Sequence, residues 1–347
     1  MKRLLMFVLI AVLLVTTLGA CSKQEDTSSG DVEGQDEIAD DKVYTIKIGH
    51  VEAEERSAHK AALEFKEYLE TESDGKIKVE VHPNSALGGD VQLSEAVASG
   101  TIEMAIPSTS VLTMYSDDFG VLDMPFIFDT PEAGFEALDK ELGERLTADL
   151  RKVGIDCLGY GFNGSRSMTN SKQPIHEPAD LKGMKVRVME SPVFIDLFKT
   201  LGANATPMSF SELFTALQQK TVDAQENPPS MIYTSRFQEV QEYLSLTNHV
   251  YNYLAMIINA DFLNSLPEEY KTLVIEAGRE FLVEGQRAKE LGDTEFYIEK
   301  LAEEGMKVNE ISPENNQKFR EALEPMYEKY EKELGEEVFE LARKYNK

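Results

Sequence analysis

The sequence predicts an α/β fold, and three observations support this prediction. Short apolar segments with a period of two residues alternate along the chain with amphipathic segments of helical period. Such a succession of strands and helices favours sheets whose strands are joined by helical crossovers. The chain has 347 residues, which fits two domains of ordinary size, and 42% of its residues are apolar, enough to form a sizeable core.

The individual elements follow from the same two periods. Tyr44, Ile46 and Ile48 lie on one face of an extended segment, which predicts a first strand over residues 43–50. Further strands are expected at 76–82, 102–107, 154–161, 185–189 and 222–225. Helices are expected at 58–70, 93–99, 132–150, 192–200 and 209–220.

The chain beyond Pro267 is predicted to be almost entirely helical. The two residues after this proline are acidic, which suits the positive N-terminal end of a helix dipole. Helical periodicity then continues to about Glu304. Glycines recur every seven residues along this segment: Gly278, Gly285 and Gly292. This spacing places them on one face, and we interpret them as small residues that pack loosely; a long, slightly flexible helix crossing between two lobes is the alternative.

The N-terminus has the pattern of a secretory signal peptide. Lys2 and Arg3 precede an apolar run over residues 4–15, which is too short for a comfortable membrane span. The run leads into a short motif, Leu18-Gly19-Ala20-Cys21. This motif resembles the bacterial lipobox, in which the cysteine is acylated and becomes the first residue. A plain signal peptide and a membrane anchor helix are the alternatives.

We therefore expect a lipoprotein signal peptide over residues 1–20 and a lipid on Cys21. Residues 21–42 are rich in Ser, Asp, Glu, Gly and Gln, so they cannot bury enough apolar surface to fold and are predicted to be a disordered tether. The folded part would then lie outside the cytoplasm, held to the outer face of a bacterial cell membrane.

Charge and cysteine content exclude several function classes. The chain has 35 basic and 62 acidic residues, a net charge of −27, which argues against a nucleic-acid-binding protein. Removing residues 1–20 leaves 33 basic residues and a net charge of −29. No CxxC or HExxH motif indicates a metal site, and Cys157 would be left as a single buried thiol. No nucleophile elbow, Walker loop or dinucleotide fingerprint indicates an enzyme, and no cofactor is expected.

Polar side chains at predicted strand ends are the candidates for a binding site. Arg187 alternates with two valines in a predicted strand, so it is either a solvent-facing side chain or a fixed guanidinium at a domain interface. A guanidinium matches a carboxylate with two parallel hydrogen bonds. Arg166 follows a predicted strand in a turn-like segment, and Asn227 precedes two prolines that stiffen its turn.

Three segments together resemble the extracytoplasmic solute-binding proteins of TRAP transporters (tripartite, ATP-independent), the DctP-like family. They are DLKGMKVRV at 180–188, LGA at 201–203 with PMSFSE at 207–212, and VDAQENP at 222–228. Pro83, Leu87-Gly88-Gly89 and Asn248-His249 also fit. The resemblance covers roughly residues 43–340.

The resemblance implies a periplasmic-binding-protein-like fold of two α/β lobes, with a hinge and a long C-terminal helix that spans both lobes. Lobe I would comprise residues 43–163 plus about 253–292, and lobe II residues 164–252 plus about 293–347. The lobes would close on a small organic carboxylate. Arg187 would form the salt bridge to the carboxylate, Arg166 would lie near it, and Asn227 would donate a hydrogen bond to it.

The resemblance also implies further ligand contacts. Phe210 would pack on the body of the ligand. Ser108 and Glu190 would determine which substrate is bound. His50 is also a candidate ligand residue, in the first lobe. Glu190 would repel a second carboxylate and accept hydrogen bonds from hydroxyl groups, which favours a sugar acid such as a hexuronate over a C4-dicarboxylate.

The expected function is therefore that of a monomeric solute-binding subunit that delivers its ligand to TRAP permease subunits in the membrane. A C4-dicarboxylate-binding protein of the same family and a ligand receptor for a sensor kinase are the alternatives. A surface hydrolase is a third class, which would show turnover rather than binding alone.

Overall fold

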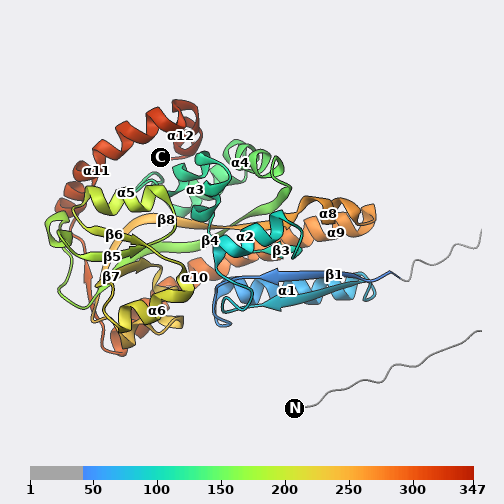
Figure 1. Cartoon of the computed structure of the whole chain (residues 1–347), viewed down its shortest axis with the longest axis horizontal. Helices are drawn as coiled ribbons and strands as arrows, with labels where there is room; N and C mark the ends of the chain where they lie inside the picture. Colours follow the sequence, from blue (N-terminus) through green and yellow to red (C-terminus); the bar gives the residue numbers. More distant parts are fainter. Residues whose placement is uncertain (1–41) are drawn as a thin grey trace, which may run out of the picture. The chain divides into compact units, whose positions relative to one another are not determined.

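A nine-stranded sheet runs through the part of the chain that the structure describes, residues 42–347 of a computed structural model (Figure 1). The strands follow the order β2-β1-β3-β8-β4-β7-β5-β6, and β9 pairs with β8. Their bounds are β1 Tyr44–Gly49, β2 Ile77–His82, β3 Met104–Ala105, β4 Ile155–Asn170, β5 Lys185–Val188, β6 Asn204–Pro207, β7 Ala224–Asn227, β8 Tyr243–Asn259 and β9 Lys307–Glu310. This arrangement confirms the α/β class.

The sheet has two halves. In the first half β1 runs parallel to β2 and β3, and in the second half β5 runs parallel to β6 and β7. The long strands β4 and β8 are antiparallel neighbours that pass through both halves. Their pairing shifts register at three places, and one shift lies on each side of residues 164–166. Such bulges bend a strand and redirect its side chains.

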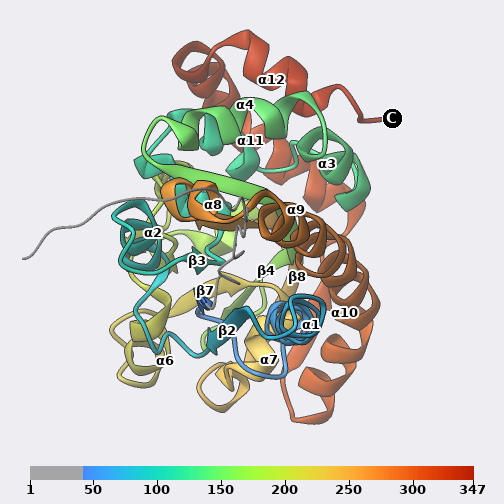
Figure 2. The same cartoon turned by 90° about the vertical axis from the view of Figure 1, so that its right-hand side faces the viewer.

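Helices cover both faces of the sheet. Figure 2 shows α3, α4, α11 and α12 above the sheet, α6 and α7 below it, and α1 beside β2. The helices are α1 Ser57–Glu72, α2 Asp90–Ala98, α3 Pro131–Leu138, α4 Glu141–Arg151, α5 Pro192–Thr200, α6 Phe210–Gln218, α7 Pro229–Thr234, α8 Ala260–Ser265, α9 Glu268–Ala277, α10 Gln286–Glu303, α11 Pro313–Leu334 and α12 Glu336–Arg343. Helix α1 buries Ala58, Ala61 and Phe65 in the core of the first half, together with Ile46 and Ile48 of β1.

The predicted long helix is continuous from Glu268 to Glu303 and reaches from the first half to β9 of the second. Its middle part, Gly278–Gly285, is a π-helix, which the sequence pattern did not predict. A Cβ atom on Gly278 would lie 2.6 Å from Leu158 of β4, so this glycine permits close packing of helix on sheet. A Cβ atom on Gly292 would meet no described atom within 4 Å outside its own helix turn, so Gly278 lies in a close contact and Gly292 does not.

Several predicted elements differ from the structure. The strand expected at 102–107 has only two residues, and the helix expected at 132–150 is interrupted at Lys140, whose backbone is not helical. The strand expected at 154–161 continues to Asn170. Strand β8 was not predicted, because most of its residues are buried on both faces and the period of two is therefore absent.

The predicted signal peptide, the acylated Cys21 and nearly all of the predicted tether lie outside the described residues. Among residues 42–347, no helix combines the length and the apolar character that crossing a membrane requires.

Candidate functional site

A small cavity lined by both polar and apolar side chains lies where the parallel strands of both halves end. Glu52 follows β1, Ser108 follows β3, Arg187 lies near the end of β5, and Asn227 is the last residue of β7. Ligands of open α/β sheets bind at the carboxyl ends of strands, and this cavity has that position. Its lining residues are Val51, Glu52, Asp90, Ser108, Asn163, Arg166, Arg187, Met189, Phe210, Asn227, Met231 and Leu254.

Arg187 is a buried guanidinium without a carboxylate partner. Its side chain is 3% exposed, and both Nε and one terminal nitrogen donate to the carbonyl oxygen of Met208, at 2.9 and 2.6 Å. Among the described residues, no carboxylate oxygen lies within 4.0 Å of its nitrogens, whereas the other buried arginines all form ion pairs. Burial lowers the pKa of Arg187 to about 10. An anion entering the cavity would compensate this charge.

Arg166 lies inside β4 and not in a turn after it, which corrects the sequence interpretation. Its guanidinium forms a buried ion pair with Glu226 of β7 and also donates to the Glu226 carbonyl oxygen at 2.6 Å. Burial opposes the charge of Glu226, but Arg166 outweighs it and holds the pKa of Glu226 below its usual value. Gly164 has φ +123° and lets Pro228 approach: a Cβ on this glycine would lie 2.6 Å from the proline. This approach brings β7 beside Arg166.

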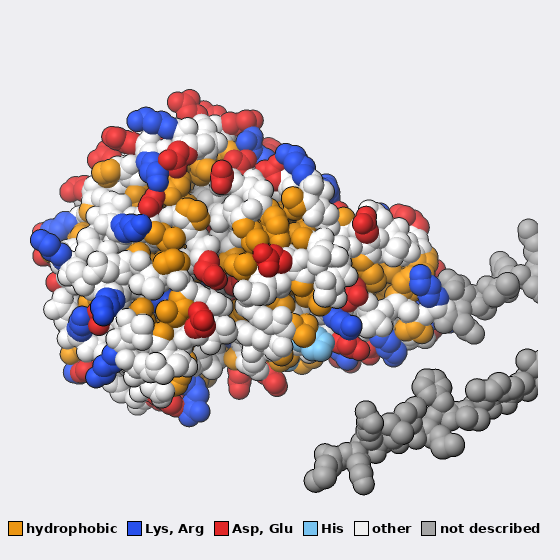
Figure 3. Space-filling model, viewed as in Figure 1, with side chains coloured by type: hydrophobic (Ala, Val, Ile, Leu, Met, Phe, Trp, Pro, Cys, Tyr) orange, Lys and Arg blue, Asp and Glu red, His pale blue; other side chains and the backbone are white. Residues whose placement is uncertain are grey.

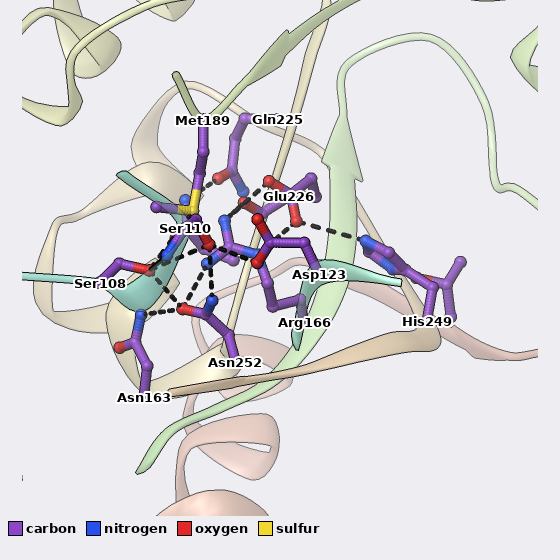
Figure 4. Close-up of polar contacts among 12 residues, drawn as sticks. Ser108, Ser110, Asp123, Asn163, Arg166, Met189, Gln225, Glu226, His249 and Asn252 are labelled. Atoms are coloured by element: carbon purple, nitrogen blue, oxygen red, sulfur yellow. Dashed lines mark hydrogen bonds and ion pairs between the residues drawn. The ribbon is translucent and has the colours of Figure 1, made fainter. Parts of the chain in front are cut away.

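Asn252 of β8 connects the arginine to the first half of the sheet. Its Oδ1 accepts hydrogen bonds from Ser108 at 3.1 Å, Asn163 at 2.8 Å and Arg166 at 3.4 Å. Figure 4 shows these contacts continuing through Glu226 to His249, whose Nε2 lies 3.3 Å from the carboxylate. Side chains from several strands therefore form one hydrogen-bonded network in the wall of the cavity.

Five of the seven predicted ligand residues line this cavity: Arg187, Arg166, Asn227, Phe210 and Ser108. The amide of Asn227 donates to Gln225 at 2.5 Å. The ring of Phe210, at the start of α6, packs against Phe237 with centroids 5.9 Å apart. Phe210 is partly buried and presents an apolar surface to the cavity.

The structure places the other two predicted residues outside the lining. Glu190 is exposed, although its charge acts on Arg187. His50 is fully buried, with Nε2 3.1 Å from Nδ1 of His59. Burial lowers the pKa of His50 to about 3, so it is a neutral core side chain.

Two acidic residues that sequence analysis missed lie in the cavity instead. Glu52 is 1% exposed, and its Oε1 has no hydrogen-bond partner among the described residues. The same holds for the buried Oδ1 of Asp90, the first residue of α2. Burial raises the pKa of Asp90 to about 7, and Glu52 adds to this. The sequence signal was weak: each acid follows a strand or a glycine turn in a chain with 62 acids.

Asp123 is a buried acid that accepts hydrogen bonds from Ser110 at 2.6 Å and from Ser191 at 2.8 Å. Burial raises the pKa of Asp123 from 3.8 to about 7; Arg166 lowers it and Glu226 raises it. The folded state then binds more protons than the unfolded state between these values, so stability falls as the pH rises through this window.

We therefore expect Asp123→Asn to flatten the pH dependence, because the amide fits between the same hydroxyls without titrating. Urea unfolding at pH 5 and pH 8 measures this. The unaltered protein should lose more stability at pH 8 than the variant does. Asp90 contributes in the same direction, so some slope should remain. Equal slopes for the two proteins would contradict a buried, titrating Asp123.

Outside the cavity, charges of both signs are interspersed. Figure 3 shows Lys, Arg, Asp and Glu side chains mixed over one face, with hydrophobic side chains between them. Among residues 42–347, no group of three or more His, Cys, Asp or Glu side chains is placed to hold a metal ion.

Comparison with known proteins identifies close relatives of this chain. The family described as "Bacterial extracellular solute-binding protein, family 7" (DctP) matches residues 48–333. A sugar acid binding protein of Advenella mimigardefordensis, solved with galactonate, is 38% identical, with a TM-score of 0.85 over 88% of this chain and 99% of that one. A TRAP periplasmic solute-binding protein of Polaromonas sp. JS666, bound to D-erythronate, is 35% identical, with a TM-score of 0.82 over 86% and 98%. The C4-dicarboxylate-binding protein DctB of Bacillus subtilis is 34% identical over 89% of this chain and 87% of its own length.

Proposed function

Because the chain belongs to family 7 of the bacterial extracellular solute-binding proteins, the TRAP-type DctP family, we propose that its cavity binds a sugar acid with one carboxylate and several hydroxyl groups. The observation that supports this most directly is the buried, unpaired guanidinium of Arg187. The ligand carboxylate accepts hydrogen bonds from it, and charge-assisted bonds of this kind contribute about 1.5–3 kcal/mol each.

The acidic residues of the cavity favour hydroxyl groups over a second carboxylate. Glu52 Oε1 and Asp90 Oδ1 are acceptors without donors, and a hydroxyl group supplies the missing proton. A second carboxylate would meet two acids and be repelled. We therefore assign to Glu52 and Asp90 the acceptance of ligand hydroxyl groups that the sequence had suggested for Glu190, which is exposed. Relatives solved with galactonate and erythronate agree with this preference, and the name of DctB makes a C4-dicarboxylate the second candidate.

A thermal-shift screen tests the ligand class. The panel contains galactonate, erythronate, glucuronate, succinate, pyruvate and sialic acid. A ligand at 100 times its dissociation constant adds about 2.7 kcal/mol of stability, which gives a clear shift. We expect the largest shift from a sugar acid. A larger shift from succinate would overturn the proposal in favour of the dicarboxylate class.

We expect Asp90→Asn to raise the affinity for succinate, relative to the affinity for galactonate, about tenfold, which is equivalent to about 1.4 kcal/mol. The variant removes a negative charge near the site of a second carboxylate. Calorimetry at pH 8, where Asp90 is charged, measures both affinities. Lowering the pH to 6 should move the unaltered protein in the same direction, since the pKa of Asp90 is about 7.

Asp74→Asn is the matched control for this experiment. Asp74 is exposed and has φ +49°, a conformation that asparagine adopts as readily. Its variant should keep the ratio of the two affinities. An unchanged ratio in Asp90→Asn would remove Asp90 from the hydroxyl-accepting wall.

In the cell, we propose that the protein delivers this ligand to TRAP permease subunits from a lipid anchor on Cys21. The lobes predicted from the sequence would close around the cavity, which draws its walls from both halves of the sheet. Cys21→Ala should release the protein from membranes without changing its ligand affinity. Fractionation and calorimetry check this, and a variant that stays in the membrane fraction would contradict acylation.

A further inference from the structure

Arg56 is a second fully buried guanidinium, and all five of its N–H groups are used. Nε donates to Glu52 Oε2. One terminal nitrogen donates to Ser230 Oγ and, at 2.8 Å, to Glu290 Oε1. The other donates to the carbonyl oxygen and to Oδ1 of Asn163, at 3.0 and 2.7 Å. Arg56 itself is not part of the cavity lining.

The partners of Arg56 come from both halves of the sheet. Glu52 and Asn163 line the ligand cavity, from the end of β1 and from β4. Ser230 lies on α7, three residues after Asn227 of the second half. Glu290 lies on α10, beyond the π-helical part of the long helix. One guanidinium thus joins the cavity wall to α7 and to the long helix.

Ser230 is the contact that reaches the second half. Its hydroxyl accepts from Arg56 and donates to Glu290 Oε1 at 2.6 Å, so it closes a ring of three side chains. Ser57, on α1, donates to the other oxygen of Glu290 at 2.5 Å and accepts from Gln286 at 2.9 Å, and none of its hydrogen bonds among the described residues reaches α7. Both serines are buried, 1% and 2% exposed. The two hydroxyls therefore form a matched pair around one carboxylate.

Arg56 and the four side chains bonded to it (Glu52, Asn163, Ser230 and Glu290) form a buried cluster, and this cluster also sets the orientation of Glu52. Because Oε2 is held by Arg56, Oε1 is left as the oxygen without a partner. Two carboxylates share one guanidinium, so the cluster carries an excess negative charge in a buried place. Such a site favours a neutral donor over another anion at Glu52.

We propose that Arg56 is a positioning residue that holds Glu52 ready for a ligand hydroxyl and, through Ser230, fastens this wall of the cavity to α7. This inference rests on the proposed function. Arg56 does not touch the ligand. Its contacts across the two halves exist only when the halves lie together, so they stabilise the closed form and slow the release of the ligand.

Ser230→Ala and Ser57→Ala test the fastening. Stopped-flow binding uses the sugar acid of the panel that shifts the unaltered protein most. We expect Ser230→Ala to raise the dissociation rate at least about tenfold with an association rate within about threefold, because the variant loses two hydrogen bonds to charged groups, those with Arg56 and Glu290. Ser57→Ala should change the dissociation rate by less than about twofold. Equal effects of the two variants would overturn the proposal.

Arg56→Lys tests the positioning of Glu52. Lysine keeps the charge but cannot bond Glu52, Asn163, Ser230 and Glu290 together. We expect the affinity for galactonate relative to hexanoate, an acid of equal chain length without hydroxyls, to fall about tenfold. A purely structural role would lower both affinities alike and would overturn the proposal. If the unaltered protein binds no sugar acid, the proposed function itself fails, which is a separate result.

Discussion

Replacing Arg187 with lysine is expected to raise the dissociation constant for the sugar acid at least about 100-fold, although the positive charge is kept. Two nitrogens of the guanidinium are held by the Met208 carbonyl oxygen, and the rest of the planar group remains for the ligand. A lysine ammonium is a point charge that cannot hold both partners in this geometry. The loss corresponds to about 2.7 kcal/mol, within the range of one or two charge-assisted bonds.

Calorimetry with the unaltered protein and the variant measures this effect. Arg151→Lys is the control, because Arg151 is an exposed arginine that pairs with Asp156 away from the cavity. It should leave the affinity unchanged. Binding by Arg187→Lys within a few-fold of the unaltered protein would show that Arg187 is not the anchor of the carboxylate.

Replacing Arg166 with methionine is expected to lower the free energy of unfolding by about 3–5 kcal/mol. The substitution leaves the charge of Glu226 buried, with only His249 3.3 Å away. Breaking a buried ion pair by removing one partner is costly for this reason. In contrast, Arg151→Met breaks an exposed pair and should cost less than about 1 kcal/mol. Urea unfolding at pH 7 compares these variants.

A second substitution separates lost charge compensation from lost packing. Adding Glu226→Gln to Arg166→Met removes the unpaired charge, so the double variant should be more stable than Arg166→Met alone. Equal stability of the double and the single variant would indicate that the loss comes from the packing of Arg166, which stacks on Phe194 with 5.2 Å to the ring centroid, and not from the unpaired charge.

Only some of the residues that line the cavity could be predicted from the sequence. Arg187 and Asn227 lie in short strands whose pattern and motifs are visible in the sequence, and both line the cavity. Arg166 was also predicted, but it was placed in a turn, whereas it lies inside β4. This strand is bent by bulges and continues beyond its predicted end. Glu190 follows the same strand as Arg187 but lies at the surface, whereas Glu52 and Asp90 lie in the cavity.

The α/β class, most of the elements and the two arginines that line the cavity could be predicted from the sequence, because periodicity and motifs are local properties of the chain. Only the tertiary structure decided which charges are compensated. Arg56, Arg166 and Arg187 are all buried, yet the carboxylate partners of the first two lie up to 234 positions away in the sequence, and Arg187 has none among residues 42–347. The interaction of two charges depends on their distance and burial in space, and neither can be read from one chain segment alone.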